Sequence, residues 1–294
     1  MKDFKDKVAV VSGAASGIGL ALARRFAQDG MHLVLADIEA APLAQARAEI
    51  QALGVQVLAV QTDVSSEAQV WALADAAFQR FGNVHVLCNN AGVALPGLMA
   101  PGWQSSVADW RWVLDVNLMG VLYGVQAFVP RMLAGGEQGH VVNTASVAGL
   151  LTASNPYHVS KHAVACMTEG LYKDFKRLGA RLSASVLCPG LINTAIMHAE
   201  RNRPPEQGPA TDLSQLPEPV QRAVSQFSQA LLAGYDPADV AQAVADAIRA
   251  DQFYVVPAQQ PLQAQIDLRM NDILQRRNPT LPKPLFSDGQ AKAD

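Results

Sequence analysis

Cysteine is scarce in this sequence, and long apolar runs are missing. Its three cysteines, Cys88, Cys166 and Cys188, each lie in an apolar stretch and lack the spacing of a metal site. We interpret them as buried free thiols of a reducing compartment and expect no metal ion. No apolar stretch is long enough to span a bilayer, and the charged residues at 1–7 do not resemble a signal peptide. We therefore expect a cytoplasmic protein without a membrane partner.

Charged residues are also few, at 17% of 294 residues, and the net charge is only −3. This balance gives no sign of an extended basic surface, so we expect no nucleic-acid partner. Hydrophobic residues make up 50% of the chain, which suits one large domain with a sizeable core. Because there is no internal repeat and no linker, we expect residues 1–294 to form a single domain.

Short β-rich apolar runs alternate with helical patterns along most of the chain. Such alternation with short loops predicts a parallel sheet with helices on both faces. We therefore predict an α/β fold, a doubly wound Rossmann-type parallel sheet of about seven strands. Right-handed crossovers place the carboxyl ends of all the strands at one edge of the sheet. The runs interpreted as strands are 8–11, 31–36, 55–60, 83–88, 140–145, 182–187 and 253–256.

A glycine-rich turn follows the first of these strands and opens a helix. Its pattern is Ser12-Gly13-x-x-x-Gly17-x-Gly19. Missing side chains let the backbone approach a pyrophosphate, whose charge the helix N-terminus favours. Strand, glycine turn and helix together are the context that a dinucleotide site requires. The alternative is a turn that serves only tight packing of strand on helix.

Asp37 ends the second strand, 18 residues after Gly19. A carboxylate at this position accepts hydrogen bonds from an adenosine ribose and repels a 2′-phosphate. An NADP site would place a basic residue nearby, yet the two obvious positions hold Ser16 and Ile38. The sequence therefore favours NAD, although Asp37 could also be a solvated turn residue.

Tyr157 and Lys161 stand four residues apart at the start of a long predicted helix. Asn155 suits the N-cap of this helix and Pro156 its first position. Residues at i and i+4 share one helix face, so phenol and ammonium can point into one pocket. A nearby positive charge favours phenolate, and we expect it to lower the pKa of Tyr157 for proton transfer near neutral pH. Taken alone, the pair could equally be a surface Tyr and Lys.

Two segments lie outside this regular pattern. Residues 194–219 are rich in proline and polar residues and are predicted to form a substrate lid, and residues 257–294 an extended C-terminal tail. We interpret Arg201 and Arg203, with His158 and His198, as exposed charges around the lid.

With these landmarks the chain resembles the short-chain dehydrogenase/reductase family in its compact form, over residues 7–256. Besides the glycine turn, Asp63-Val64 matches the pair that contacts adenine, and Asn89-Asn90-Ala91-Gly92 matches the segment behind the cofactor. The family's catalytic tetrad falls on Asn117, Ser146, Tyr157 and Lys161. The segment that holds the nicotinamide amide falls on Pro189, Gly190, Ile192 and Thr194.

The resemblance implies interconversion of a secondary alcohol and its ketone with NAD. Tyr157 would exchange the proton, Lys161 would lower its pKa and hold the nicotinamide ribose, and Ser146 would stabilise the reacting oxygen. Asn117 would hold a water linking Lys161 to solvent. The cofactor-binding residues expected are Gly13, Ser16, Gly17, Ile18, Gly19, Asp37, Ile38, Asp63, Val64, Asn90, Ala91, Gly92, Tyr157, Lys161, Pro189, Gly190, Ile192 and Thr194.

The chain departs from the family at the loop before Tyr157, which follows Ser146 by only 11 residues. This spacing leaves Thr144 as a second candidate for the hydroxyl role. The expected substrate pocket, from Leu95–Trp103, Val147–Ser154, Leu191, Ile192 and Met197, is mostly apolar. It predicts a bulky hydrophobic or aromatic substrate.

Three other interpretations remain open for the same scaffold. They are an NADP-dependent ketone reductase, a sugar-nucleotide epimerase of the family's extended branch, and a non-catalytic NAD-binding sensor. The resemblance also implies a homodimer or homotetramer, packed through the helical regions 107–133 and 157–178.

Overall fold

A seven-stranded parallel sheet forms the centre of the protein. The computed structural model describes residues 1–95, 101–208 and 212–282. The strands are ordered β3-β2-β1-β4-β5-β6-β7, and every neighbouring pair is parallel. This arrangement confirms the predicted doubly wound α/β fold. The strands are β1 (Val8–Ser12), β2 (His32–Asp37), β3 (Val57–Gln61), β4 (Val86–Asn89), β5 (Gly139–Thr144), β6 (Leu182–Leu187) and β7 (Tyr254–Val255).

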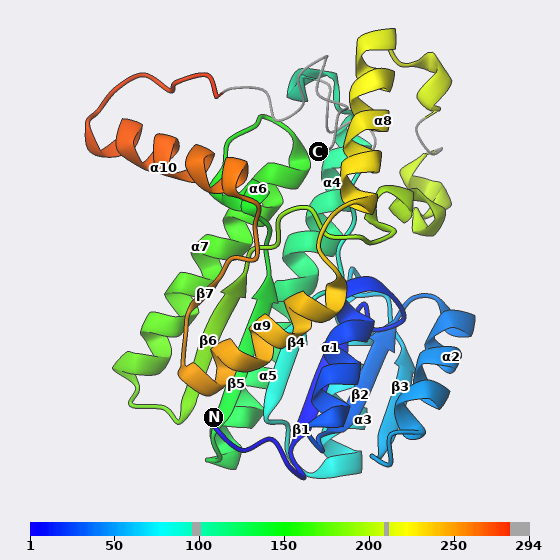
Figure 1. Ribbon diagram of the computed structural model, residues 1–294. Helices are drawn as coiled ribbons and strands as arrows, with labels where there is room; N and C mark the ends of the chain where they lie inside the picture. The colour runs from blue at the N-terminus through cyan, green and yellow to red at the C-terminus, as the bar shows by residue number, and fades with distance from the viewer. Residues whose placement is uncertain (96–100, 209–211, 283–294) are drawn as a thin grey trace.

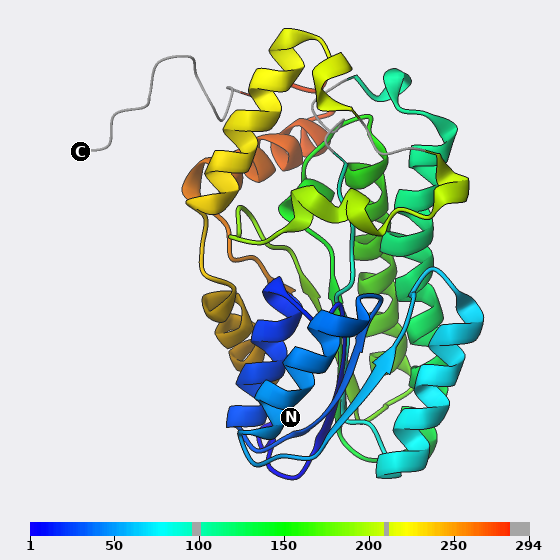
Figure 2. The ribbon, with the colours of Figure 1, turned by 90° about the vertical axis from the view of Figure 1, so that its right-hand side faces the viewer.

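Helices cover both faces of the sheet (Figures 1 and 2). One face is covered by α1 (Gly17–Gln28), α2 (Ala40–Gln51) and α9 (Pro237–Ala250). The other is covered by α3 (Glu67–Phe81), α5 (Gly120–Gly135) and α7 (Pro156–Arg177). The remaining helices, which lie above the carboxyl ends of the strands, are α4 (Val107–Leu114), α6 (Val147–Leu150), α8 (Glu218–Leu232) and α10 (Gln260–Leu274).

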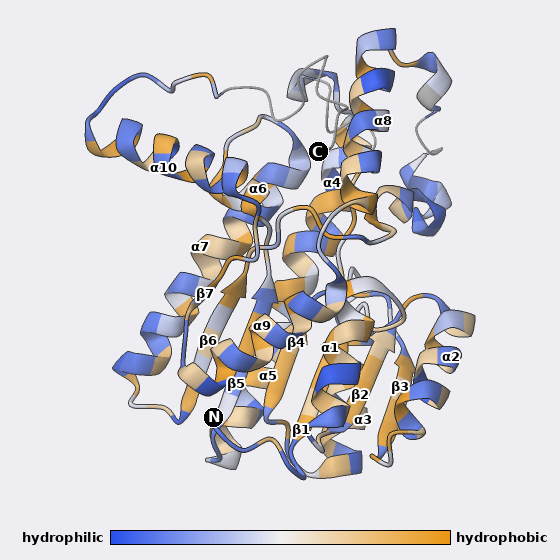
Figure 3. Cartoon of the chain, in the orientation of Figure 1, coloured by the Kyte–Doolittle hydropathy of each residue, from blue (hydrophilic) through white to orange (hydrophobic). Residues whose placement is uncertain are grey.

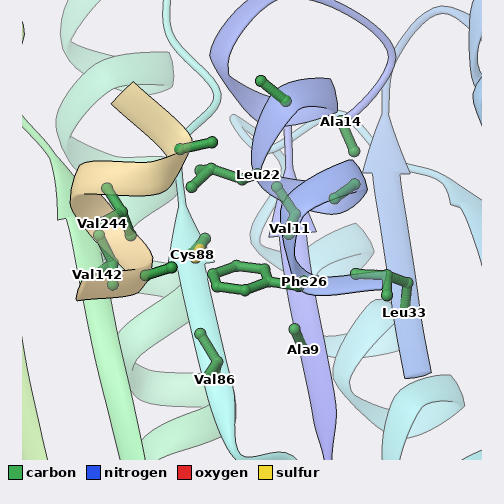
Figure 4. Close-up of a cluster of buried hydrophobic side chains, with 14 of the residues drawn as sticks. Ala9, Val11, Ala14, Leu22, Phe26, Leu33, Val86, Cys88, Val142 and Val244 are labelled. Atoms are coloured by element: carbon green, nitrogen blue, oxygen red, sulfur yellow. The ribbon is translucent and has the colours of Figure 1, made fainter. Parts of the chain in front are cut away.

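The strands are apolar on both faces because both faces are covered. Every residue of β1, β4, β5 and β6 is buried, and Figure 3 shows hydrophobic strands behind helices whose outer faces are hydrophilic. Phe26 of α1 is fully buried between the sheet and α9 (Figure 4). Burying one such side chain contributes about 1.5–3 kcal/mol. These contacts fix the first helix on the strand that precedes the glycine turn.

The order of the strands reverses direction between β1 and β4. From β1 the chain winds outward through β2 and β3, and from β4 it winds the other way through β5 and β6. Loops leaving β1 and β4 therefore separate, which opens a crevice at their carboxyl ends. All of the sequence motifs lie at this edge.

The helical region from Val107 to Gly135 combines α4, one turn of π-helix at Asp115–Met119, and α5. By length and composition it could cross a membrane, so the expectation that no apolar stretch is long enough is wrong here, but half of its most apolar window is buried within the protein. The α5 segment packs against α3 and β4. Its apolar character therefore reflects a helix of the domain core.

Three local expectations need correction or refinement. Cys166 is exposed, whereas Cys88 and Cys188 are buried, so the prediction of three buried thiols is wrong at Cys166. Its neighbours in the sequence are apolar, but it lies on the outward face of α7.

The loop after β5 contains the short helix α6, and the predicted lid contains 3₁₀-helices at Ile196–Asn202, Pro205–Gln207 and Leu213–Gln215 before α8 begins. Residues 283–294 of the predicted tail lie outside the described residues.

Candidate active site

A long cleft follows the carboxyl edge of the sheet and collects most of the predicted site residues. It is lined from the glycine turn, the ends of β2, β4 and β5, α7 and the lid. The predicted cofactor residues that line it are Gly13, Ser16, Gly17, Ile18, Asp37, Ile38, Asp63, Val64, Asn90, Ala91, Gly92, Tyr157, Lys161, Pro189 and Thr194. Residues as far apart as the first and sixth strands thus share one surface.

The glycine turn packs too closely against its surroundings to admit side chains. Gly13 has φ +65°, and a Cβ there would lie 2.9 Å from the Ala91 Cα. A Cβ on Gly19 would lie 2.0 Å from the carbonyl oxygen of Gly13. Gly19 therefore supports the turn from behind and does not line the cleft itself. Ser16 is the N-cap of α1, but its side chain makes no capping hydrogen bond, so the first turn of the helix presents its N–H groups to an anion.

Asp37 at the end of β2 is only 9% exposed and holds the adjoining loops together. Its two carboxylate oxygens accept hydrogen bonds from Ala15 N at 2.9 Å and Glu39 N at 3.0 Å. The carboxylate is thereby fixed at one end of the cleft, where a ribose hydroxyl could donate to its remaining lone pairs.

Ser12 ties the end of β1 to the segment after β4. Its hydroxyl accepts hydrogen bonds from Asn90 N at 2.9 Å and Ala91 N at 3.1 Å. The Asn90 side chain donates to the Ser12 carbonyl at 3.0 Å. Ser12 opens the predicted glycine pattern but was not among the predicted site residues; its contacts lie 78 and 79 residues away in the sequence.

Tyr157 and Lys161 enter the cleft from the first turns of α7. Asn155 caps this helix by accepting from His158 N at 3.0 Å, and Pro156 occupies its first turn, as predicted. The Lys161 Nζ lies 5.8 Å from the centre of the Tyr157 ring and donates to the Thr144 carbonyl oxygen at 2.9 Å. The ammonium is therefore anchored to the end of β5 beside the phenol.

Burial perturbs both groups. It lowers the pKa of Lys161 to about 8. It raises the pKa of Tyr157, and a hydrogen bond with Ser146 opposes this effect. The expected lowering of the Tyr157 pKa is therefore wrong in its net direction, because removal from water outweighs the stabilisation of phenolate in this structure.

The two candidate hydroxyls have separate partners. Ser146 is buried and hydrogen-bonds with Tyr157; its Oγ also donates to the Pro189 carbonyl at 3.3 Å. The Thr144 hydroxyl instead donates to the Asn90 side chain at 3.3 Å. This geometry favours Ser146 over Thr144 as the partner of Tyr157.

Asn117 lies in the π-helical turn and is completely buried. Its side chain accepts from Val93 N at 2.8 Å and donates to the Val93 carbonyl at 3.0 Å and the Ser160 hydroxyl at 3.2 Å. The amide thus joins the segment after β4 to α7. The side chain is engaged by protein groups, and its expected water-holding role stays a prediction.

Three other predicted residues do not line the cleft. Ser146 is buried and hydrogen-bonds with Tyr157, Gly190 packs against Ala258 and Gln259, and Ile192 is 3% exposed and bridges to Tyr235. Of the expected substrate pocket, residues 96–100 lie outside the described residues. Trp103 is 83% exposed.

Several residues of the lid line the cleft, although the sequence did not single them out for this position. Ala195, Ile196, Ala199, Arg201, Asn202 and Pro204 all line the cleft, and so does Glu39. Arg203 is not an exposed charge as expected: its side chain is 5% exposed and pairs with Asp109 at 2.7 Å. No local pattern signals these contacts, since Arg201 meets Glu39 across 162 residues.

Comparison with known proteins assigns this arrangement to a family. The model of the short chain dehydrogenases matches residues 7–205. The chain belongs to the short-chain dehydrogenase/reductase family. It is similar to the CLA biosynthesis dehydrogenase/reductase of Lactiplantibacillus plantarum, with 36% identity over 89% of this chain and 92% of that protein. The C alpha-dehydrogenase of a Sphingobium species is 31% identical over 87% of this chain and 82% of that protein.

A solved structure supports the same assignment. The short-chain dehydrogenase/reductase of Burkholderia phymatum, determined in complex with NAD, has a TM-score of 0.89 and 44% identity. The match covers 97% of this chain and 100% of that one. The protein is thus an oxidoreductase of a family whose members bind nicotinamide cofactors.

The residues of this chain fit such a cofactor. The uncapped first turn of α1 suits a pyrophosphate, the glycine turn leaves room for its approach, and Asp37 suits a ribose diol. Tyr157 and Lys161 stand toward the other end of the cleft with Thr194, where the nicotinamide half would lie.

Proposed function

We propose that the protein is an NAD-dependent alcohol dehydrogenase that interconverts a secondary alcohol and its ketone. The observation that carries this proposal is the grouping of Tyr157, Ser146 and Lys161 at the cleft that the glycine turn and Asp37 also line. In oxidation, Tyr157 would accept the alcohol proton while Ser146 hydrogen-bonds the reacting oxygen. Lys161 would support the phenolate with its charge. The nicotinamide supplies the acceptor for the hydride.

The preference for NAD rests on charge at the adenosine end of the cleft. Asp37 and Glu39 both line this end, and two carboxylates oppose a 2′-phosphate. The Burkholderia phymatum relative was determined with NAD, which agrees with this choice. An NADP-dependent ketone reductase is the alternative that a cofactor comparison would reveal.

A bulky hydrophobic substrate is proposed because apolar side chains line the same cleft as Tyr157. They are Val93, Trp112, Val116, Ile196 and Ala199. Val93, Trp112, Val116 and Ala199 belong to one apolar cluster, which includes a residue of the lid.

Initial rates of NADH formation across aryl, alicyclic and steroid secondary alcohols would test the proposal, with NADP in parallel. We expect turnover with NAD and a marked preference within the panel. Faster turnover with NADP would contradict the cofactor assignment, and a preference for small charged alcohols would contradict the substrate class. Tight NADH binding without turnover of any alcohol would favour a sensor.

We further propose a cytoplasmic homodimer or homotetramer, as expected from the family resemblance. Val159 and Cys166 are exposed on α7, a helix that the resemblance places at a subunit interface. Sedimentation equilibrium at micromolar concentration should give two or four chains. A monomer under these conditions would contradict the proposal.

A further inference from the structure

The lid is fastened to the body of the protein on both sides of the cofactor cleft. On one side Arg203 pairs with Asp109 of α4 at 2.7 Å and lies 5.3 Å from the centre of the Trp112 ring. Ala199 is buried in the apolar cluster that contains Trp112. On the other side Arg201 reaches the N-terminus of α2. The lid therefore spans the cleft as a strap.

The contact at α2 is a two-pronged ion pair. Arg201 Nε donates to Glu39 Oε1 at 3.0 Å, and Nη2 donates to Glu39 Oε2 at 2.6 Å. Paired donation from a planar guanidinium to a carboxylate fixes direction as well as distance. These hydrogen bonds hold the pKa of Glu39 below its usual value, so the carboxylate is charged at neutral pH. The side chains are 41% and 24% exposed, which leaves the pair within reach of a ligand.

Both members of the pair border the place where an adenosine ribose would lie. Glu39 stands two residues after Asp37 and donates its backbone N–H to the Asp37 carboxylate at 3.0 Å. Arg201, Asp37, Ile38 and Glu39 line the same cleft. The charge of Asp37 also acts on Arg201. Three charged groups therefore meet at this end, with a combined charge of about −1 from two carboxylates and one guanidinium.

We propose that Glu39 and Arg201 determine cofactor specificity: Glu39 rejects a 2′-phosphate by its own charge and by keeping Arg201 occupied. Arg201 is the cation placed to receive a phosphate at this end of the cleft. Glu39 binds the Nε–Nη2 edge of Arg201, and Nη1 donates to the His198 carbonyl at 2.8 Å. As long as these bonds hold, a 2′-phosphate gains no free cation and meets two carboxylates. The inference rests on the proposed use of a nicotinamide dinucleotide.

Removing either charge opens the strap, but the two changes should have opposite effects on specificity. Glu39→Gln removes one repelling charge and frees Arg201, so it should favour the phosphorylated cofactor. Arg201→Gln removes the cation and leaves Asp37 and Glu39 unneutralised, so it should disfavour that cofactor further. A purely structural strap predicts that both variants weaken NADH and NADPH equally.

The test is the ratio of dissociation constants for NADPH and NADH, measured by cofactor fluorescence without substrate. We expect Glu39→Gln to lower this ratio by about ten-fold or more, because the substitution removes one negative charge that repels the 2′-phosphate and frees Arg201. Arg201→Gln should raise the ratio, and the double variant should lose most of the gain of Glu39→Gln. Calorimetry with 2′,5′-ADP and 5′-AMP should show the same order for the adenosine half alone.

Glu49→Gln is the matched control. Glu49 makes the same two-pronged pair with Arg24 on the outer face of α1 and α2 and is absent from the cleft lining. This variant should leave the ratio unchanged. Thermal unfolding of all variants shows whether they are folded at the temperature of the titrations.

The outcomes separate this inference from the proposed function. Wild-type protein that binds neither NADH nor NADPH would overturn both. Wild-type binding with an unchanged ratio in Glu39→Gln would overturn only the role of the strap. A lowered ratio that persists in the double variant would overturn the role of Arg201.

Discussion

The Nζ of Lys161 lies 5.8 Å from the centre of the Tyr157 ring, and its donation to the Thr144 carbonyl holds it there. We expect this proximity to couple the charge of Lys161 to the proton of Tyr157. Burial raises the pKa of Tyr157, so we expect formation of the phenolate to require support from that positive charge. Burial lowers the pKa of Lys161 to about 8, so the ammonium is present below this pH.

Replacing Lys161 with Met should therefore raise the pKa of Tyr157 further. We expect kcat for alcohol oxidation at pH 7 to fall by about 10²-fold, with the rising limb of the pH profile displaced upward. NADH binding, measured separately by fluorescence, accounts for any loss of cofactor affinity. A profile that keeps its position would show that Lys161 does not set the pKa of Tyr157.

Gly102, in the segment after β4, fastens that segment to the loop before α7. Gly102 N donates to the Ser154 hydroxyl at 3.2 Å, and a Cβ on Gly102 would lie 1.7 Å from the Ser154 carbonyl oxygen. Gly102→Ala must therefore separate two loops that flank the proposed substrate pocket. We expect KM for the alcohol to rise about ten-fold or more, while the dissociation constant of NADH stays unchanged.

Gly136→Ala provides the comparison, since no atom lies within 4 Å of a Cβ at that position. It has φ +66°, so a modest loss of stability is expected. An unchanged KM in Gly102→Ala, with thermal stability equal to the wild type, would exclude the loop contact from substrate binding.

Stability should depend on pH through His140, which is fully buried in β5. Its Nε2 lies 2.7 Å from the Ser185 hydroxyl, which itself donates to the Gln252 carbonyl. Burial lowers the pKa of His140 to about 3, with smaller effects from the N-terminal ammonium, Asp251 and Lys176. The folded protein thus resists a proton that the unfolded chain accepts near pH 6.5.

This difference in proton uptake makes the folded protein less stable at acidic pH. Above pH 6.5 neither state binds the proton at His140, so the residue adds no pH dependence. Between about pH 6.5 and 3 only the unfolded state is protonated at His140. As the pH is lowered through this range, the free energy of unfolding falls by about 1.4 kcal/mol per pH unit. Urea unfolding of wild type and His140→Gln between pH 5 and 7 measures this contribution. Equal slopes for the two proteins would contradict it.

Local sequence predicted much of the scaffold. The strands are short, apolar on both faces and separated by helices, so a parallel sheet with all carboxyl ends at one edge could be predicted. The start of α7 at Pro156, with Asn155 as its cap, was predictable because capping involves adjacent residues. The common edge of the strands then brought the motif residues into one cleft.

Features that depend on distant contacts could not be predicted in this way. The Arg201–Glu39 pair joins residues 162 positions apart, and the burial of Arg203 depends on α4. The net direction of the Tyr157 pKa required knowledge of its burial, which spacing to Lys161 does not provide. Asn117 was singled out by resemblance, yet its bonds to Val93 arise from a π-helical turn with no local signal.

The central claim is that Tyr157 transfers the proton, and Tyr157→Phe tests it most directly. The substitution keeps the ring in the cleft and removes only the hydroxyl. We expect kcat for secondary-alcohol oxidation with NAD to fall by about 10²–10⁴-fold, because a positioned acid or base contributes this much. NADH should bind within about three-fold of the wild-type affinity, which is less than 1 kcal/mol. Unchanged kcat with intact NADH binding would contradict the account.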